Sequence, residues 1–178
     1  NYVYFNEQNR GEHVASQVQM DEAREYVRKV LGDKVKVEFE RITGFSGEWA
    51  EAENLIKIST IAGPGALHTA YHEALHAFWS RLGGNPEVRE LLTNVTSNPV
   101  ILQRLKGLLA GEKKAIAQLD EAEERVAYAY QFWAAGRLDV GSKATTLFRK
   151  VKAAFRRVLG MVRDEDRALA IFEAFHAG

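Results

Sequence analysis

His72-Glu73-Ala74-Leu75-His76 places two histidines four residues apart, with a glutamate directly after the first. In an α-helix, a rise of about 1.5 Å and a turn of about 100° per residue put both imidazoles on one face, roughly 6 Å apart along the axis. Two histidines in this arrangement can bind one metal ion from the same side. Glu73 lies about 100° around the axis, where it can reach a water molecule held at that ion and act as a general base. The motif therefore predicts a helix and a zinc-dependent hydrolase.

A simpler interpretation of the motif is that both histidines are ordinary polar residues of a helix and that Glu73 is a solvated neighbour. The chain has five histidines among 178 residues. With this content of histidine and the glutamate content of the chain, about 0.01 matches to the H-E-x-x-H pattern are expected by chance over its length. The residues around the motif must therefore decide between the two interpretations.

Composition limits the class of protein and the kind of metal ligand. We expect a single domain over residues 1–178, with a sizeable core. The 24 basic and 24 acidic residues cancel, so no overall charge favours binding to nucleic acid or to an anionic membrane. There are no cysteines, so histidine and carboxylate must hold any metal ion. A chain without cysteine also fits a reducing compartment such as the cytoplasm.

The first third of the chain contains the strand patterns. Residues 20–31 show a helical apolar stripe, and residues 34–42 and 55–60 alternate in the way typical of half-buried strands. Residues 2–5 are a candidate third strand. Residues 43–48 hold two glycines and are predicted to form a turn.

From residue 66 onward the apolar pattern is helical. The predicted helices cover residues 66–82, 87–93, 99–109, 112–135, 142–159 and 164–176. Strands followed by helices predict an α+β fold, in which a small N-terminal sheet packs on a mainly helical bundle. Within the single domain we distinguish a strand-containing part (1–62), the metal-site helices (63–136) and the C-terminal helices (137–178).

A catalytic zinc site usually needs a third protein ligand. His68 precedes His72 by one helical turn, but three ligands along one straight helix would span about 12 Å, too far for a single ion. The better candidates are Glu124 and Glu123 in the helix predicted at residues 112–135. Both share a helix face with Ala127, whose small side chain allows two helices to approach closely. We prefer Glu124 and keep Glu123 as the alternative.

The motif followed by a glutamate on a later helix resembles the gluzincin branch of the zincin metallopeptidases. Members often carry that glutamate as E-x-x-A, and Glu124-Arg125-Val126-Ala127 matches this pattern. The wider chain is similar to metallopeptidase domains in the large polyvalent proteins of phages and other mobile elements. The segments that carry this similarity are residues 56–59, 72–78, 124–136 and 171–175.

The resemblance implies a zincin-like fold and a Zn²⁺ ion bound by His72, His76 and Glu124. It also implies a protein or peptide substrate, and a chain that belongs to a larger polypeptide. Such a protein would act in the cytoplasm, in a virion or after delivery into a host cell.

The mechanism implied by this site is hydrolysis by a water molecule whose pKa zinc lowers to about 7. Glu73 would take the proton of that water and later deliver it to the leaving amine. Tyr128, one turn beyond Glu124, is our first candidate for the donor that stabilises the oxyanion, and Tyr71 and His68 are alternatives. A tyrosine in such a position is more often a residue of the core or of the pocket rim.

The strand at residues 55–60 is the candidate for substrate binding, because in zincins an edge strand before the metal helix commonly pairs with an extended peptide. The alternative is that this strand is purely structural.

Two other functions stay open. Residues 143–159 form a basic amphipathic pattern that fits binding to nucleic acid or to a membrane surface, or simply a core helix with a solvated basic face. The chain can also be a catalytically silent zincin-fold module, although the presence of Glu73 argues against this.

Overall fold

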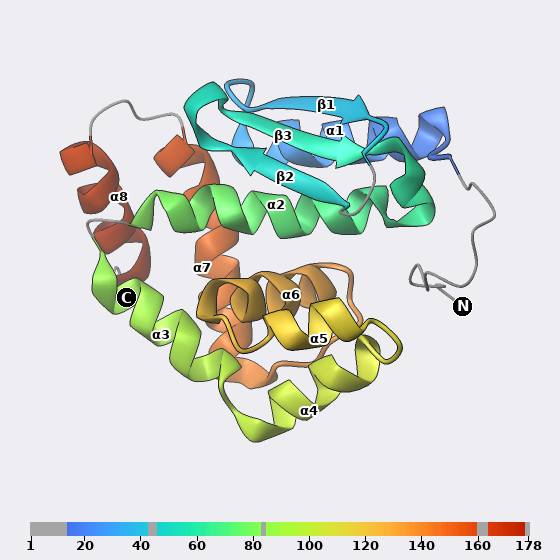
Figure 1. Ribbon diagram of the computed structural model, residues 1–178. Helices are drawn as coiled ribbons and strands as arrows, with labels where there is room; N and C mark the ends of the chain where they lie inside the picture. Colours follow the sequence, from blue (N-terminus) through green and yellow to red (C-terminus); the bar gives the residue numbers. More distant parts are fainter. Residues whose placement is uncertain (1–13, 43–45, 83–84, 160–163, 177–178) are drawn as a thin grey trace.

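The computed structural model describes residues 14–42, 46–82, 85–159 and 164–176. These residues form an α+β fold in which a small three-stranded sheet accompanies a mainly helical structure (Figure 1). The fold class predicted from the sequence is confirmed at this level. The candidate strand at residues 2–5 lies outside the described residues.

The sheet consists of strands β1 (Lys36–Glu40), β2 (Gly47–Ala50) and β3 (Leu55–Ser59). Their order is β1-β3-β2, so β3 is the central strand. β1 pairs parallel to β3, and β2 pairs antiparallel to it. Ile56 and Ile58 of β3 are fully buried and anchor the sheet on the core. β2 is the edge strand on one side of this sheet, which matters for the site described below.

The turn predicted at residues 43–48 is wrong for its last two residues, because Gly47 and Glu48 belong to β2. A strand of four residues that begins with glycine is too short and too poor in strand formers to be recognised by alternation. It forms because β3 offers its second edge, with Trp49 opposite Ile56 in the register. Residues 43–45 lie outside the described part of the chain.

The helices are α1 (Gln17–Leu31), α2 (Ala66–Ser80), α3 (Pro86–Thr96), α4 (Pro99–Leu108), α5 (Lys113–Gln118), α6 (Ala122–Ala134), α7 (Gly141–Leu159) and α8 (Asp164–His176), with short 3-10 helices η1 (Glu51–Glu53) and η2 (Thr60–Gly65). Helices α1 and α2 pack against this sheet, and the other helices extend away from it (Figure 1). α1 starts earlier than predicted, because Ser16 and Gln19 form a capping box. The helix predicted at residues 164–176 is found with the same ends, and the other predicted helices are present with shifted ends, except for residues 112–135.

Residues 112–135 form two helices, α5 and α6, instead of the single long helix that we predicted. Arg125, in the first turn of α6, donates a hydrogen bond from Nη1 to Leu119 O (2.9 Å) and so satisfies a carbonyl at the end of α5. No glycine or proline marks this break, so apolar periodicity alone misses it. The break places Glu123 and Glu124 in the first turn of α6, where the positive end of the helix dipole stabilises carboxylates.

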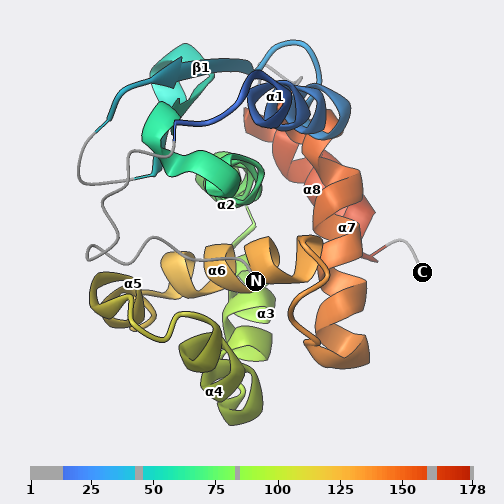
Figure 2. The ribbon, with the colours of Figure 1, turned by 90° about the vertical axis from the view of Figure 1, so that its right-hand side faces the viewer.

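α2 is the central element of the fold. It contacts α1, β2 and β3 on one side and α6 and α7 on the other. Figure 2 shows α2 end-on between the sheet and α6. Phe78 of α2 is fully buried, and its ring lies 5.2 Å from that of Phe155 and 6.5 Å from that of Phe175. These aromatic contacts hold α2, and with it the motif, against α7 and α8.

The basic amphipathic pattern at residues 143–159 lies within helix α7. Its buried apolar residues include Leu147, Phe148, Val151 and Phe155, and its exposed basic residues include Lys143, Arg149 and Lys152. The apolar face therefore packs into the core, as a core helix with a solvated basic face would. Among the described residues, no helix combines the length and apolar character needed to cross a membrane.

Replacing Phe78 by alanine tests whether α2 is anchored as described. We expect Phe78→Ala to lower the free energy of unfolding by about 3–5 kcal/mol, because it opens a cavity among aromatic rings. Val18→Ala on α1 is the control, since Val18 is 66% exposed and its loss is expected to change stability by at most about 0.5 kcal/mol. Urea unfolding measures both, and equal effects of the two substitutions would contradict the core described above.

Candidate metal centre

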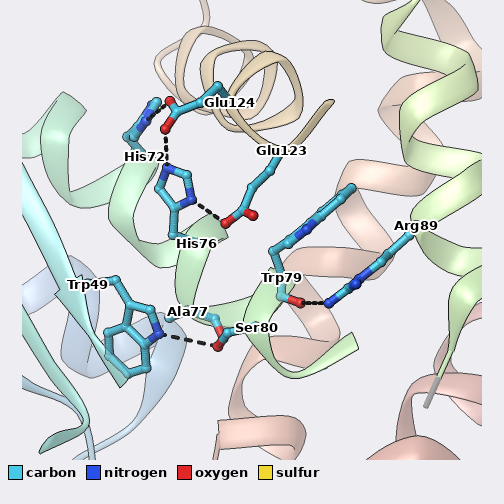
Figure 3. A network of polar contacts seen from close by, with 9 residues as sticks. All are labelled: Trp49, His72, His76, Ala77, Trp79, Ser80, Arg89, Glu123 and Glu124. Carbon is cyan, nitrogen blue, oxygen red and sulfur yellow. Dashed lines mark hydrogen bonds and ion pairs between the residues drawn. The ribbon is translucent and has the colours of Figure 1, made fainter. Parts of the chain in front are cut away.

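The motif lies in the middle of α2, and its side chains point in two directions. His72 and His76 face α6, and their rings are 4.8 Å apart (Figure 3). Glu73 is turned about 100° away from His72, toward the edge strand β2, and is only 6% exposed. The predicted helical geometry of the motif is therefore present, with the histidines and the glutamate on separate faces.

Glu124 on α6 meets both histidines. Its Oε2 lies 3.2 Å from His72 Nε2, and its Oε1 lies 3.6 Å from His76 Nε2. One ligand atom from each of the three residues lies within 4.8 Å of the others. The three side chains are 12%, 15% and 25% exposed, so the cluster is partly buried yet open to solvent. His72, His76 and Glu124 can hold a metal ion.

The second ring nitrogens of the histidines have partners of their own. His76 Nδ1 lies 2.6 Å from Glu123 Oε1, and His72 Nδ1 lies 3.1 Å from Gln131 Oε1. Both partners are acceptors, so each Nδ1 carries a hydrogen and donates it. These two bonds fix the ring orientations and direct both Nε2 atoms toward Glu124.

This pattern of donors calls for a positive charge between the rings and Glu124. With Nδ1 protonated, a neutral imidazole presents a lone pair at Nε2, and a lone pair facing a carboxylate oxygen is repelled. A proton on each Nε2 or a shared cation removes the conflict. The imidazole and carboxylate donors around this space are those that a divalent metal ion of the zinc type prefers.

The charges of the cluster shift its acidities in opposite directions. Burial raises the pKa of Glu124, but the hydrogen bond and charge of His72 and the charge of His76 outweigh it, so the net pKa is lowered. Burial lowers the pKa of His76, but the hydrogen bond to Glu123 and the charges of Glu73 and Glu124 outweigh it, so the net pKa is raised. Glu124 is therefore held as a carboxylate opposite the rings.

The pKa of Glu73 shifts in the opposite direction from that of Glu124. Burial raises its pKa, and the charges of Glu124 and Glu48 add to this, while His72 and His76 oppose it in part. The net result is a carboxyl group with a raised pKa beside the histidine pair. A buried carboxylate of this kind is a stronger proton acceptor than a solvated one.

The structure separates the two candidate third ligands. Glu124 lies on the Nε2 side of both rings, whereas Glu123 bonds to Nδ1 of His76, on the opposite side of that ring. The one-residue offset between them, with the helix turning about 100° per residue, sends their carboxylates to different nitrogens.

Of the three candidate oxyanion donors, Tyr128 contacts the histidine pair, whereas the rings of Tyr71 and His68 lie 6.2 Å from each other. The Tyr128 ring is 4.5 Å from that of His72, and its hydroxyl donates to Gln118 Oε1 (3.1 Å). Tyr71 packs edge-on against Tyr26 at 4.4 Å. The pKa of His68 is lowered by burial and by the nearby charge of Arg137, which favours its neutral form.

Gln131 is the part of the site that the sequence analysis missed. It lies seven residues after Glu124, two helical turns further along the same face of α6, and is 5% exposed. A buried amide on the face that carries the third ligand is a usable signal, because buried polar groups require partners. The sequence alone, however, does not show which of the two rings it reaches.

Comparisons of the chain with protein-family models, with curated proteins and with solved structures give no match.

Glu73→Gln tests the burial of this carboxyl group in the metal-free protein. Because the folded pKa lies above the unfolded one, the stabilising contribution is complete below about pH 4.3 and is lost as the pH rises through the folded pKa. The neutral amide avoids this loss, so we expect the variant to be more stable than the parent at pH 7, with the difference shrinking at pH 4.

Urea unfolding at the two pH values, with chelator present, measures the effect. Glu53→Gln, at an exposed position of η1, is the matched control and should show no such gain. A gain for Glu73→Gln that is equal at pH 4 and pH 7 would contradict the burial argument.

Proposed function

We propose that this chain is a zinc-dependent peptidase of the zincin type, with His72, His76 and Glu124 as metal ligands and Glu73 as general base. One observation carries the proposal. Two Nε2 atoms from one helix and a carboxylate from another converge, while separate acceptors hold both Nδ1 atoms. Ordinary surface histidines have no need of this double arrangement.

Zinc fits these residues better than calcium or magnesium does. Two imidazoles and one carboxylate are a frequent protein ligand set of catalytic zinc, with a further coordination position left for water or substrate. Calcium and magnesium prefer oxygen ligands, and the pair of histidines disfavours both. The chain has no cysteine, which removes the thiolate sites typical of structural zinc.

When bound, zinc supplies Lewis acidity, which activates water as a nucleophile near neutral pH and polarises the scissile carbonyl. The residues of the chain supply the rest. Glu73 accepts a proton from the attacking water and then donates it to the leaving amine, a role that its raised pKa favours. Glu123 and Gln131 keep the rings oriented, and Glu124 stays ionised opposite them.

The sheet supports a peptide as substrate, but through a different strand from the one we expected. The strand predicted at residues 55–60 corresponds to β3 (Leu55–Ser59), which is paired on both sides and so has no free edge. β2 lies at the edge of the sheet formed by the described residues, and it packs against α2 beside Glu73. An extended peptide that adds to β2 by backbone hydrogen bonds would run alongside the metal centre.

Tyr128 remains our first candidate for the oxyanion donor. Its ring already lies against that of His72, and its hydroxyl would exchange Gln118 for the substrate oxygen. A catalytically silent module would keep the metal cluster but gain nothing from the burial of Glu73, which costs free energy. We therefore favour the enzyme over the silent module.

Metal analysis of single variants tests the ligand assignment and the role of Glu73 together. We expect the parent to bind one equivalent of zinc, and His72→Ala and Glu124→Ala to lose it, because each removes a protein ligand. Glu73→Gln should keep the zinc and lower kcat/KM by about 10²–10⁴-fold. Elemental analysis and cleavage of a fluorogenic peptide library measure these effects, and full activity of Glu73→Gln would refute the mechanism.

Variants of Glu123 distinguish an orienting acceptor from a ligand. Glu123→Ala should weaken zinc binding by about 10–100-fold, because His76 loses the partner that orients it. Glu123→Gln retains an acceptor oxygen and should be much closer to the parent. The control is Glu121→Ala, at an exposed position just before α6.

Competition with a chromogenic zinc chelator gives the affinities. If Glu123→Ala abolished stoichiometric binding while Glu124→Ala retained it, the two glutamates would have exchanged roles.

A further inference from the structure

Gly47 is the point at which the edge strand β2 touches the metal-site helix. A Cβ atom added to Gly47 would overlap Thr69 Cγ2 of α2. It would also lie 3.1 Å from Glu73 Cγ and 3.0 Å from the backbone oxygen of Lys57 in β3. The backbone of β2 therefore lies against the side-chain stem of Glu73, with no room for another atom.

The requirement at Gly47 is for space and not for backbone freedom. Gly47 lies in a regular strand, and its φ is not in the left-handed region that favours glycine. Other glycines differ in this respect. An added Cβ at Gly65 or Gly107 would have no heavy atom within 4 Å in the described part of the chain. Gly47 is thus a contact residue without a side chain.

The other end of β2 is also attached to α2. Trp49 lies on the same face of the strand as Gly47, since side chains two residues apart share a face. Its Nε1 donates to Ser80 Oγ (3.2 Å), as Figure 3 shows. The strand is therefore held at two points along α2, and Gly47 is the closer of the two to Glu73.

We propose that Gly47 is a positioning residue for Glu73: its missing side chain lets the edge strand close over the glutamate stem and fix where the carboxylate lies. The inference rests on the proposed function, because Glu73 matters as a base only in a hydrolase. The contact shields Glu73, which is 6% exposed, and sets the separation between the base and any peptide paired with β2.

Four proteins separate the space needed at Gly47 from the position of Glu73. They are Gly47→Ala, Thr69→Ser, the double variant of both, and Gly107→Ala. Thr69→Ser removes the Cγ2 atom that a new Cβ would overlap, so the double variant relieves that clash while leaving the close contact with Glu73 Cγ. Gly107 lies in α4 on an exposed surface and is the matched control, where alanine favours the helix.

We expect Gly47→Ala to lower the melting temperature by about 4 °C or more, because strand and helix must move apart. The double variant should regain most of this loss and bind zinc like the parent. Its kcat should nevertheless fall by roughly threefold to tenfold with KM little changed, because the base is displaced by a fraction of an ångström. Thr69→Ser and Gly107→Ala should keep the parental kcat.

A crystal structure of the double variant provides a measurement that does not depend on activity. A displaced Glu73 carboxylate supports the inference. An unmoved carboxylate together with parental kcat overturns it, as does a Gly47→Ala protein as stable as the parent. If the zinc-loaded parent cleaves no peptide, the proposed function fails, and the stability of Gly47→Ala and the position of Glu73 still decide the role of Gly47.

Discussion

The close approach of α2 and α6 is the constraint on which the site depends. Glu124 can reach Nε2 of both His72 and His76 only if the two helices lie nearly in contact, and Ala127 on the facing side of α6 is fully buried. The same approach brings Glu123 and Gln131 to the outer nitrogens of the rings. Helix packing and metal-site geometry are therefore one requirement, which the aromatic core beneath Phe78 helps to maintain.

The sequence predicts those features that depend on local spacing. The four-residue interval in the motif specifies one helix face, and the interval from Glu124 to Ala127 specifies another. Features that depend on tertiary pairing escape it. β2 pairs with the second edge of β3, and at the break before α6 the side chain of Arg125 bonds back to the carbonyl of Leu119. The partners of the ring nitrogens likewise depend on how two helices are rotated against each other.

The three glutamates of the site show how environment assigns different tasks to one residue type. Glu73 is buried against backbone and has a raised pKa, Glu124 is held ionised by two imidazoles, and Glu123 reaches from a more exposed position to the outer nitrogen of His76. The residue type alone predicts none of these differences. They follow from the face of each helix and from the element that covers it.

The short edge strand has a consequence for the behaviour of the protein in concentrated solution. A strand with an available edge can recruit a second copy of itself and start aggregation. β2 has only four residues, and Glu48 at its second position is exposed. Two copies aligned along this edge would bring like charges together, whereas a foreign peptide need not carry that charge. The short length and the negative charge of β2 therefore discourage self-assembly along this edge.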